Sequence, residues 1–349
     1  MGNKETTAKK GKGKKIWGVT WRVLCGLLAF ICTAVVGFVA VDRIRFGDFY
    51  KVAESTFDVP GTNEGYVAQG FDYDKERKVF LATGYMANDK PSRVYVLNGW
   101  GGEYYSCLAN EDGSAYTGHT GGIVHNGDYV YITGEDGLDV FSYQEILVGT
   151  PIVKKVGEIK TYIDPAYCYI AGEYLLVGSF YRAENFETAE YERMFTPTGE
   201  YNPALITAFK LDETHTETFG VNPTPCAVIS TRKKVQGMCM TDSGKIVLST
   251  SYAMSDSVLY VYDSAKVVET LEYGYSFKGV TEDGEAFDFT VARAFLDGNS
   301  CIGGIKAPSM SEELVYLDGK IYIMNESASN RYLFGKLTGG RKIYAYPYA

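Results

Sequence analysis

Residues 311–325, SEELVYLDGKIYIMN, place two apolar runs on either side of an Asp-Gly turn. Apolar strands around Asp-Gly indicate a β-hairpin, because Asp and Gly tolerate the positive φ angles of a tight two-residue turn. The same unit occurs at four more places, 70–83, 121–134, 166–178 and 237–250. Five copies of one supersecondary unit predict a repeat architecture.

The repeats also predict how many strands each unit contributes. Third strands follow several hairpins, at 92–97, 138–143, 205–211, 257–262 and 332–335, and a fourth is expected at 103–108. Four-stranded sheets arranged radially form a β-propeller, which leaves only short, protected sheet edges. We therefore predict an all-β propeller with five blades. Six blades are the alternative, because residues 275–304 contain a further strand-like segment.

The charge of the chain is divided unevenly. Residues 1–45 hold nine Lys or Arg against Glu5 and Asp42, a net charge of +7, whereas the remainder has a net charge of −16. An acidic globular part repels phosphate backbones, so nucleic acid is excluded as an expected partner.

An apolar run of about 19 residues, 23–41, is long enough as a helix of about 28 Å to cross a bilayer. Basic residues precede this run, which predicts a cytoplasmic tail at 1–22 and an extracellular side after it. We expect a single-pass type II cell-membrane protein with a juxtamembrane stalk at 42–59 and a propeller at 60–349. The alternative is a cleaved signal peptide, although the run is long for one and Val39-Ala40-Val41 is a poor cleavage site.

The propeller prediction places two sets of side chains at the top of the central channel, where innermost strands begin and second strands end. The first set is Gln69, His119, Tyr167, Gln236 and Glu312, and the second is Tyr85, Tyr181, Ser251, Tyr252 and Glu326. The connection 181–203 is long enough to cover them, and loops of that length are usually functional or disordered. We predict a ligand site at this mouth.

Each group also has a structural interpretation. In Gln69-Gly70 and Gln236-Gly237, the glycine fits a crowded axis and the glutamine tethers a neighbouring blade, or else the glutamines contact ligand. The tyrosines pack across strands or stack on a sugar or peptide.

Three side chains are candidates for catalysis: Glu312, Glu326 and His119. Neighbouring carboxylates share a proton or bind Ca²⁺, and His119 is a candidate acid, base or ligand donor. Three histidines in the whole chain, with His125 in a strand, exclude a three-histidine metal site. No cofactor is therefore expected, and Ca²⁺ is the alternative.

Several short motifs recur in a fixed order along residues 60–349. They are AQGFDY at 68–73, PSRVYVL at 91–97, HTGG at 119–122, VQGM at 235–238, LSTS at 248–251, PSMSE at 308–312 and NESA at 325–328. Together these motifs resemble bacterial secreted or membrane-anchored β-propellers without a settled activity, which are distantly similar to YncE-like and gluconolactonase-like propellers. The resemblance implies the fold and a surface location. Gluconolactonase-like relatives hold a divalent metal with carboxylate and amide side chains, and only Glu312 or Glu326 matches that set. Gln69-Gly70 with Thr83-Gly84 is also similar to plant-type glutaminyl cyclases, whose tryptophan-containing motifs this chain lacks.

Two functions are therefore expected. The first is a membrane-anchored ligand-binding or interaction module that takes a glycan, a peptide or a surface protein at its top face. The second is a channel-mouth enzyme, either a metal-dependent lactonase or hydrolase or a glutaminyl-cyclase-like enzyme.

Overall fold

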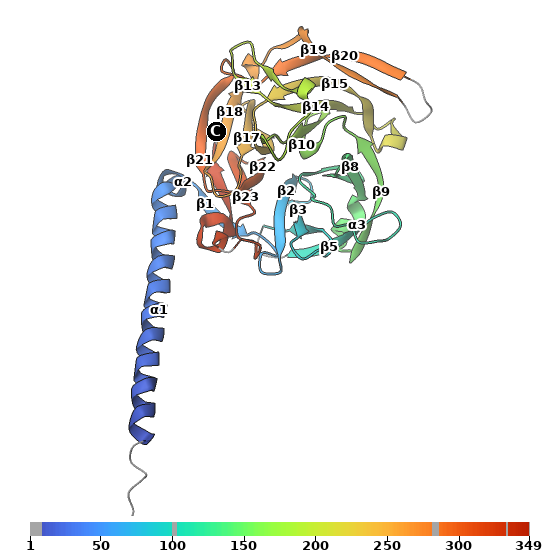
Figure 1. Ribbon diagram of the computed structural model, residues 1–349. Helices are drawn as coiled ribbons and strands as arrows, with labels where there is room; N and C mark the ends of the chain where they lie inside the picture. Colours follow the sequence, from blue (N-terminus) through green and yellow to red (C-terminus); the bar gives the residue numbers. More distant parts are fainter. Residues whose placement is uncertain (1–8, 100–102, 281–285, 333, 349) are drawn as a thin grey trace, which may run out of the picture. The chain divides into compact units, whose positions relative to one another are not determined.

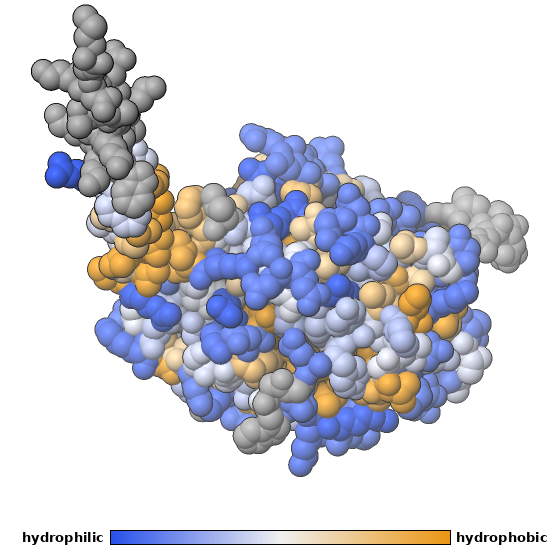
Figure 2. Space-filling view, turned by 90° about the horizontal axis from the view of Figure 1, so that it is seen from below, coloured by the Kyte–Doolittle hydropathy of each residue, from blue (hydrophilic) through white to orange (hydrophobic). Residues whose placement is uncertain are grey.

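The computed structural model describes residues 9–99, 103–280, 286–332 and 334–348. The chain forms two compact units, Met1–Gly47 and Asp48–Ala349. The first unit contains helix α1 (Lys9–Arg45). Its segment Thr20–Arg45 has a mean hydropathy of 2.6 and buries none of that apolar window, so it is long and apolar enough to cross a membrane. The predicted segment 23–41 lies within this helix, whose exposed apolar residues appear in orange in Figure 2.

The second unit contains five blades in the described part of the chain, which confirms the predicted propeller (Figure 1). Each blade is built on four strands, and a parallel pairing of the outermost strands β5 and β9 joins blades 1 and 2 into one sheet. From the innermost strand outward, blade 1 is β2 (Tyr66–Asp74), β3 (Val79–Met86), β4 (Arg93–Leu97) and β5 (Glu103–Ala109). Blade 2 is β6 (Ile123–Asn126), β7 (Tyr129–Thr133), β8 (Gly137–Ser142) and β9 (Ile152–Lys160). Blade 3 is β10 (Pro165–Ala171), β11 (Tyr174–Ser179), β14 (Ala204–Leu211) and β15 (Val221–Thr231).

Blade 4 is β16 (Val235–Met240), β17 (Lys245–Thr250), β18 (Ser257–Asp263) and β21 (Cys301–Ala307). Blade 5 is β22 (Ser311–Leu317), β23 (Lys320–Asn325), β24 (Lys342–Pro347) and β1 (Glu54–Asp58). The shorter elements are α2 (Gly47–Val52), α3 (Tyr143–Leu147), the two-stranded β12 (Met194–Phe195) and β13 (Tyr201–Asn202), and 3-10 turns at Glu190–Glu192, Thr216–Thr218, Ser264–Lys266, Gly335–Leu337 and Gly339–Arg341.

Blade 5 closes the ring with strands from both ends of the propeller. Strand β1 pairs antiparallel with β24, so the earliest strand in the sequence completes the last blade. Residues 54–58 fall within the predicted stalk, 42–59, and they form a strand of the propeller. The third strand of this blade was predicted at 332–335, which is wrong, because β24 holds that place and Gly335 begins a 3-10 turn.

A long hairpin replaces the alternative sixth blade. Strands β19 (Glu269–Val280) and β20 (Ala286–Phe295) lie between the third and fourth strands of blade 4 in sequence. They do not join blade 4, because β20 pairs in parallel with β15 and extends blade 3 to six strands. Most of the strand-like segment 275–304 therefore belongs to an insertion that lies between the hairpins of blades 4 and 5 in the sequence.

The core lies between facing sheets of adjacent blades. One cluster joins blades 1 and 5 through residues such as Phe71, Phe80 and Ile343. Equivalent clusters join blade 1 to blade 2, blade 2 to blade 3, and blade 3 to blade 4. Each fully buried large apolar side chain stabilises the folded state by about 1.5–3 kcal/mol. Both faces of a blade carry such side chains, because each face packs against a neighbouring blade. This explains why most strands read as continuous apolar runs.

Glycines let the innermost strands approach one another at the axis. A Cβ atom on Gly70 would lie 2.7 Å from the backbone nitrogen of Ile123, and one on Gly237 would lie 2.4 Å from the Cα of Glu313. Both contacts are with backbone, which cannot move aside locally. The structural interpretation of these two glycines is thereby confirmed.

Glu313 ties four of the blades together from inside the channel. Its side chain comes from β22, and the residue is 1% exposed. The Oε2 atom accepts the backbone N–H groups of Phe71 at 2.9 Å and Ile123 at 3.1 Å, and Oε1 accepts that of Cys168 at 3.3 Å. Burial raises the pKa of Glu313, and the three N–H donors oppose that rise by stabilising the carboxylate.

We predict that Glu313→Ala lowers the free energy of unfolding by about 3–5 kcal/mol, because three buried N–H groups lose their acceptor. Glu313→Gln should cost less, since its amide oxygen keeps part of this bonding. The measurement is denaturant unfolding of the full chain in detergent micelles, followed by near-UV circular dichroism. Glu272→Ala, at an exposed position of β19, is the matched control. A loss no greater than in this control would contradict the role assigned to Glu313.

Candidate functional site

Four of the five innermost strands carry a β-bulge near their first residues. The pairing register skips Gln69 in β2, Ala166 in β10 and Gln236 in β16, and it shifts between Ser311 and Leu314 in β22. A bulge adds one unpaired residue and redirects its side chain, and such bulges are common beside functional sites. Three bulged residues, Gln69, Ala166 and Gln236, line one cavity together with Glu312.

This cavity, the top cavity, has a volume of about 580 Å³. Seven of the ten predicted site residues line it: Gln69, Tyr85, His119, Gln236, Tyr252, Glu312 and Glu326. The connection 180–203 contributes Phe180 and Phe186, whose rings lie edge to face at 5.6 Å. This matches the expectation that the long connection between β11 and β14 reaches the channel mouth.

Two carboxyl groups lie at the centre of the top cavity. Glu312 is 2% exposed, and its Oε1 accepts a hydrogen bond from Gln236 Nε2 at 3.3 Å. Glu326 Oε2 accepts from Gln69 Nε2 at 3.0 Å and from the Tyr332 hydroxyl at 2.8 Å. Both glutamines thus tether blade 5, as their structural interpretation predicted, and both also line the cavity.

The pKa values of this carboxyl pair are displaced upward. Burial raises the pKa of Glu312 well above its ordinary value, and the charge of Glu326 adds to the rise. Burial also raises the pKa of Glu326 to about 7, although the bonds from Tyr332 and Gln69 favour its charged form. The pair therefore retains a proton near neutral pH, so it can both donate and accept hydrogen bonds.

Aromatic rings form the walls of the top cavity. Tyr85 stacks on His119 with ring centroids 5.1 Å apart, and the Arg331 guanidinium lies 5.3 Å from the Tyr85 ring. On another wall, the Arg182 guanidinium lies 4.2 Å from the Tyr252 ring. Such flat apolar faces beside hydrogen-bonding groups suit a ligand with both apolar and polar surfaces.

Three predicted site residues do not line the top cavity. Tyr167 is fully buried, because the bulge at Ala166 directs the alanine to the cavity and the tyrosine ring against Gly178 in the core. Tyr181 is 8% exposed and lies beneath Arg193, 5.1 Å from its guanidinium. Ser251 is also buried, and its N–H donates to the Lys234 carbonyl at 3.0 Å. A bulge changes the face of the sheet to which the following side chains point. Counting residues along a predicted strand does not reveal such a bulge.

Sequence reasoning missed other residues of the top cavity, of which Arg331, Tyr332, Asp164 and Met310 are examples. Tyr332 was not recognised as a site residue because residues 332–335 were predicted to form a strand. The Asn325-Glu-Ser-Ala328 motif was a usable signal, since polar residues directly after β23 indicate a loop at the channel mouth.

Among the described residues, no group of three or more His, Cys, Asp or Glu side chains is arranged to hold a metal ion. Glu312 and Glu326 are therefore not part of such a group in this part of the chain.

The comparison with known proteins yields distant structural similarity alone. No family model matches the sequence, and no curated protein matches it. Among solved structures, the chain is similar to a PQQ-bound aldose sugar dehydrogenase from Streptomyces coelicolor, with 9% identity, a TM-score of 0.43, and 84% of this chain and 96% of that chain covered. It is also similar to a gluconolactonase from Xanthomonas campestris (9%, 0.37, 85% and 94%) and to BamB from Moraxella catarrhalis (8%, 0.32, 81% and 85%). At these identities and TM-scores the likeness supports no conclusion about activity, and the propeller architecture rests on the strand pairing described above.

Glu326 makes stability depend on pH in a defined direction. Its carboxyl keeps a proton up to about pH 7 in the folded protein, against a usual pKa of 4.5. The folded state binds more protons between these values, so this group's stabilisation is full below pH 4.5 and is lost as pH rises through 7.

Between pH 5 and pH 8, we expect the unfolding free energy of the wild type to fall by on the order of 1–3 kcal/mol more than that of Glu326→Gln. Parallel pH profiles of thermal unfolding provide the measurement. Glu272→Gln, at an exposed position, should keep the wild-type slope. Identical slopes in the wild type and Glu326→Gln would show that Glu326 ionises normally.

Proposed function

We propose that this protein is a membrane-anchored extracellular propeller that binds a neutral glycan in the top cavity. The observation that carries the proposal is the combination of stacked aromatic walls with the Glu312–Gln236 and Glu326–Gln69 pairs. Sugar rings present C–H faces that pack on aromatic rings, and hydroxyl groups that both donate and accept hydrogen bonds. The Glu312 and Glu326 carboxyl pair, which retains a proton, can both donate hydrogen bonds to such hydroxyl groups and accept hydrogen bonds from them. The same pair disfavours anionic ligands.

The membrane location rests on α1. The Thr20–Arg45 segment has the length and hydropathy of a spanning helix. Basic residues concentrated before position 23 favour a cytoplasmic N-terminus, which places residues after 42 outside the cell. An acidic propeller in that location has access to extracellular glycans, peptides and surface proteins. Among these ligands, the chemistry of the top cavity favours glycans.

The test is a glycan array probed with the full chain in detergent micelles. For the best glycan, we expect Tyr252→Ala and Tyr85→Ala each to weaken binding by about tenfold, because each removes a stacking face. Tyr191→Ala is the matched control, since this tyrosine is 70% exposed and does not line the cavity. Absence of any glycan ligand, or equal binding by all three variants, would refute the proposal.

A hydrolase is the second candidate, and the raised pKa of Glu326 favours it. A carboxyl with a pKa of about 7 is suited to donate a proton as a general acid near neutral pH. Glu312, beside it in the cavity, would be the second carboxyl of an acid–base pair. His119 lies farther out on the wall, where its ring stacks on Tyr85.

If the glycan is hydrolysed, Glu326→Gln should lower kcat by about 100-fold or more and remove the alkaline limb of its pH profile. Glu312→Gln should also lower kcat. Reducing-end release from the array's best glycan is the measurement. Binding without release in the wild type would assign the cavity to recognition alone.

A further inference from the structure

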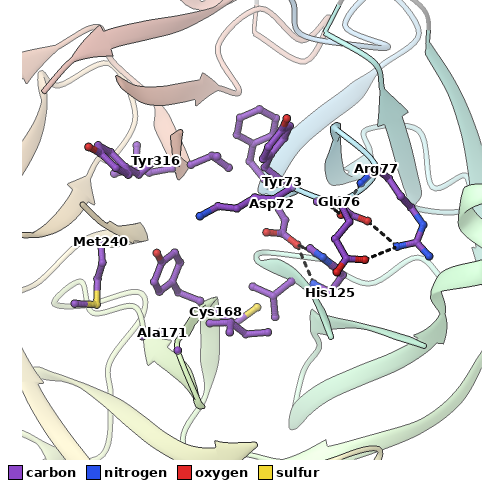
Figure 3. Close-up of a pocket in the computed structure, with 18 of the residues that line it drawn as sticks. Asp72, Tyr73, Glu76, Arg77, His125, Cys168, Ala171, Met240 and Tyr316 are labelled. Atoms are coloured by element: carbon purple, nitrogen blue, oxygen red, sulfur yellow. Dashed lines mark hydrogen bonds and ion pairs between the residues drawn. The ribbon is translucent and has the colours of Figure 1, made fainter. Parts of the chain in front are cut away.

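A second, larger cavity, the bottom cavity, opens among the hairpin turns at the other end of the innermost strands. It has a volume of about 830 Å³. Strand β22 separates the two cavities: Glu312 lines the top one and Leu314, Val315 and Tyr316 line the bottom one, with the buried Glu313 between them. Figure 3 shows side chains from several blades around this second opening.

A histidine–carboxylate pair lies on one wall of the bottom cavity. Asp72 Oδ2 accepts the backbone N–H of His125 at 2.8 Å and contacts its ring Nδ1 at 2.6 Å. The Tyr143 ring lies 5.1 Å from the imidazole and holds its other side. This arrangement fixes the imidazole through Nδ1, and within the described residues Nε2 has no hydrogen-bond partner. Burial would lower the pKa of His125, but its bond to Asp72 raises it. The acceptor that this pair offers to a ligand is therefore the second oxygen of Asp72.

Part of the charge around the bottom cavity is already balanced within the protein. Asp74 Oδ2 accepts the Tyr143 hydroxyl at 2.5 Å and Arg77 Nη1 at 3.1 Å, and Oδ1 accepts two backbone N–H groups of the turn. Burial alone would raise the pKa of Asp74, but these bonds lower it to about 2. The Arg77 guanidinium also lies 4.0 Å from the Glu76 carboxylate. Asp74 and Arg77 thus close the β2–β3 turn, whereas the Glu76 side chain stays exposed beside them.

Three other carboxylates line the bottom cavity: Asp72, Asp128 and Asp242. The ammonium group of Lys75 contributes a positive charge to the same lining. Asp128 and Asp242 are exposed in different hairpin turns, so they approach the opening from separate blades. The lining is therefore rich in acceptors and negative in charge, and a ligand that carries hydrogen-bond donors and positive charge is complementary to it.

Aromatic and sulfur-containing side chains complete the lining. Tyr73, Tyr169, Tyr316 and Met240 come from blades 1, 3, 5 and 4. Figure 3 shows Tyr73, Tyr316 and Met240 around the same opening as Asp72 and His125. Aromatic rings attract cations through their negative faces, and this attraction adds to that of the carboxylates.

We infer that the bottom cavity is a second binding site, separate from the glycan site, and that it takes the primary ammonium group of an alkylamine. Asp72 accepts one of its N–H groups, Asp128 and Asp242 provide the opposing charge, and the tyrosines cover its alkyl chain. Two sources present this group: a free diamine and the lysine side chain of a peptide. The inference does not depend on the proposed function of the top cavity.

The test is isothermal titration of the full chain in detergent micelles with cadaverine and, separately, with N-acetyl-lysine methylamide. Binding of cadaverine alone assigns the site to free diamines, and binding of the lysine amide assigns it to lysyl side chains; either result supports the inference. N,N′-diacetylcadaverine, in which both amines are blocked, is the neutral control and should not bind.

Variants separate recognition from folding. Asp242→Asn and Asp128→Asn should each weaken binding by about threefold to tenfold, since each removes a partly solvated opposing charge. Lys75→Gln should strengthen binding by a similar factor, which a damaged fold cannot do. Glu272→Gln, at an exposed position of β19 outside both cavities, is the matched control and should leave the affinity unchanged. Failure of both amines to bind, or affinities unchanged by Asp242→Asn and Lys75→Gln, would overturn the inference.

Discussion

One buried carboxylate organises the centre of the propeller. Glu313 reaches from β22 across the axis and accepts backbone N–H groups from β2, β6 and β10. These donors would otherwise lack partners, because the innermost strand of a blade has no neighbouring strand on its channel side. An unpaired buried N–H group is costly, so the carboxylate replaces a missing strand for three blades at once.

The close approach of the strands around Glu313 has consequences at both ends of the channel. Glycines at 70 and 237 are required because backbone from the next blade occupies the position of a Cβ atom. The bulges just before them turn Gln69 and Gln236 toward the top cavity, where each bonds a glutamate of blade 5. The same residues that close the ring therefore also build the wall of the candidate site, so structural and functional interpretations of these glutamines are compatible.

The two cavities differ in chemistry although they share the same five strands. In the top cavity, buried Glu312 and Glu326 carry raised pKa values, and their polar contacts are with amide and hydroxyl groups. In the bottom cavity, Asp74 is charged and bonded within its own turn, and exposed Asp128 and Asp242 keep their water contact. Burial depth separates a pocket suited to neutral ligands from one suited to cations, because desolvation penalises charge only where water is removed.

The sequence by itself determined the hairpin repeats, the five innermost strands and the apolar N-terminal helix, because Asp-Gly turns and apolar periodicity are local properties. It also placed Gln69, His119, Gln236, Glu312 and Glu326 at one channel mouth, since equivalent repeat positions share one end of a ring. Tertiary structure decided what depends on contacts between distant segments. The pairing of β1 with β24 and of β20 with β15 follows from which edges meet after folding. Likewise, bulges moved Tyr167 into the core, and the crowded axis made Glu313 the acceptor for three blades.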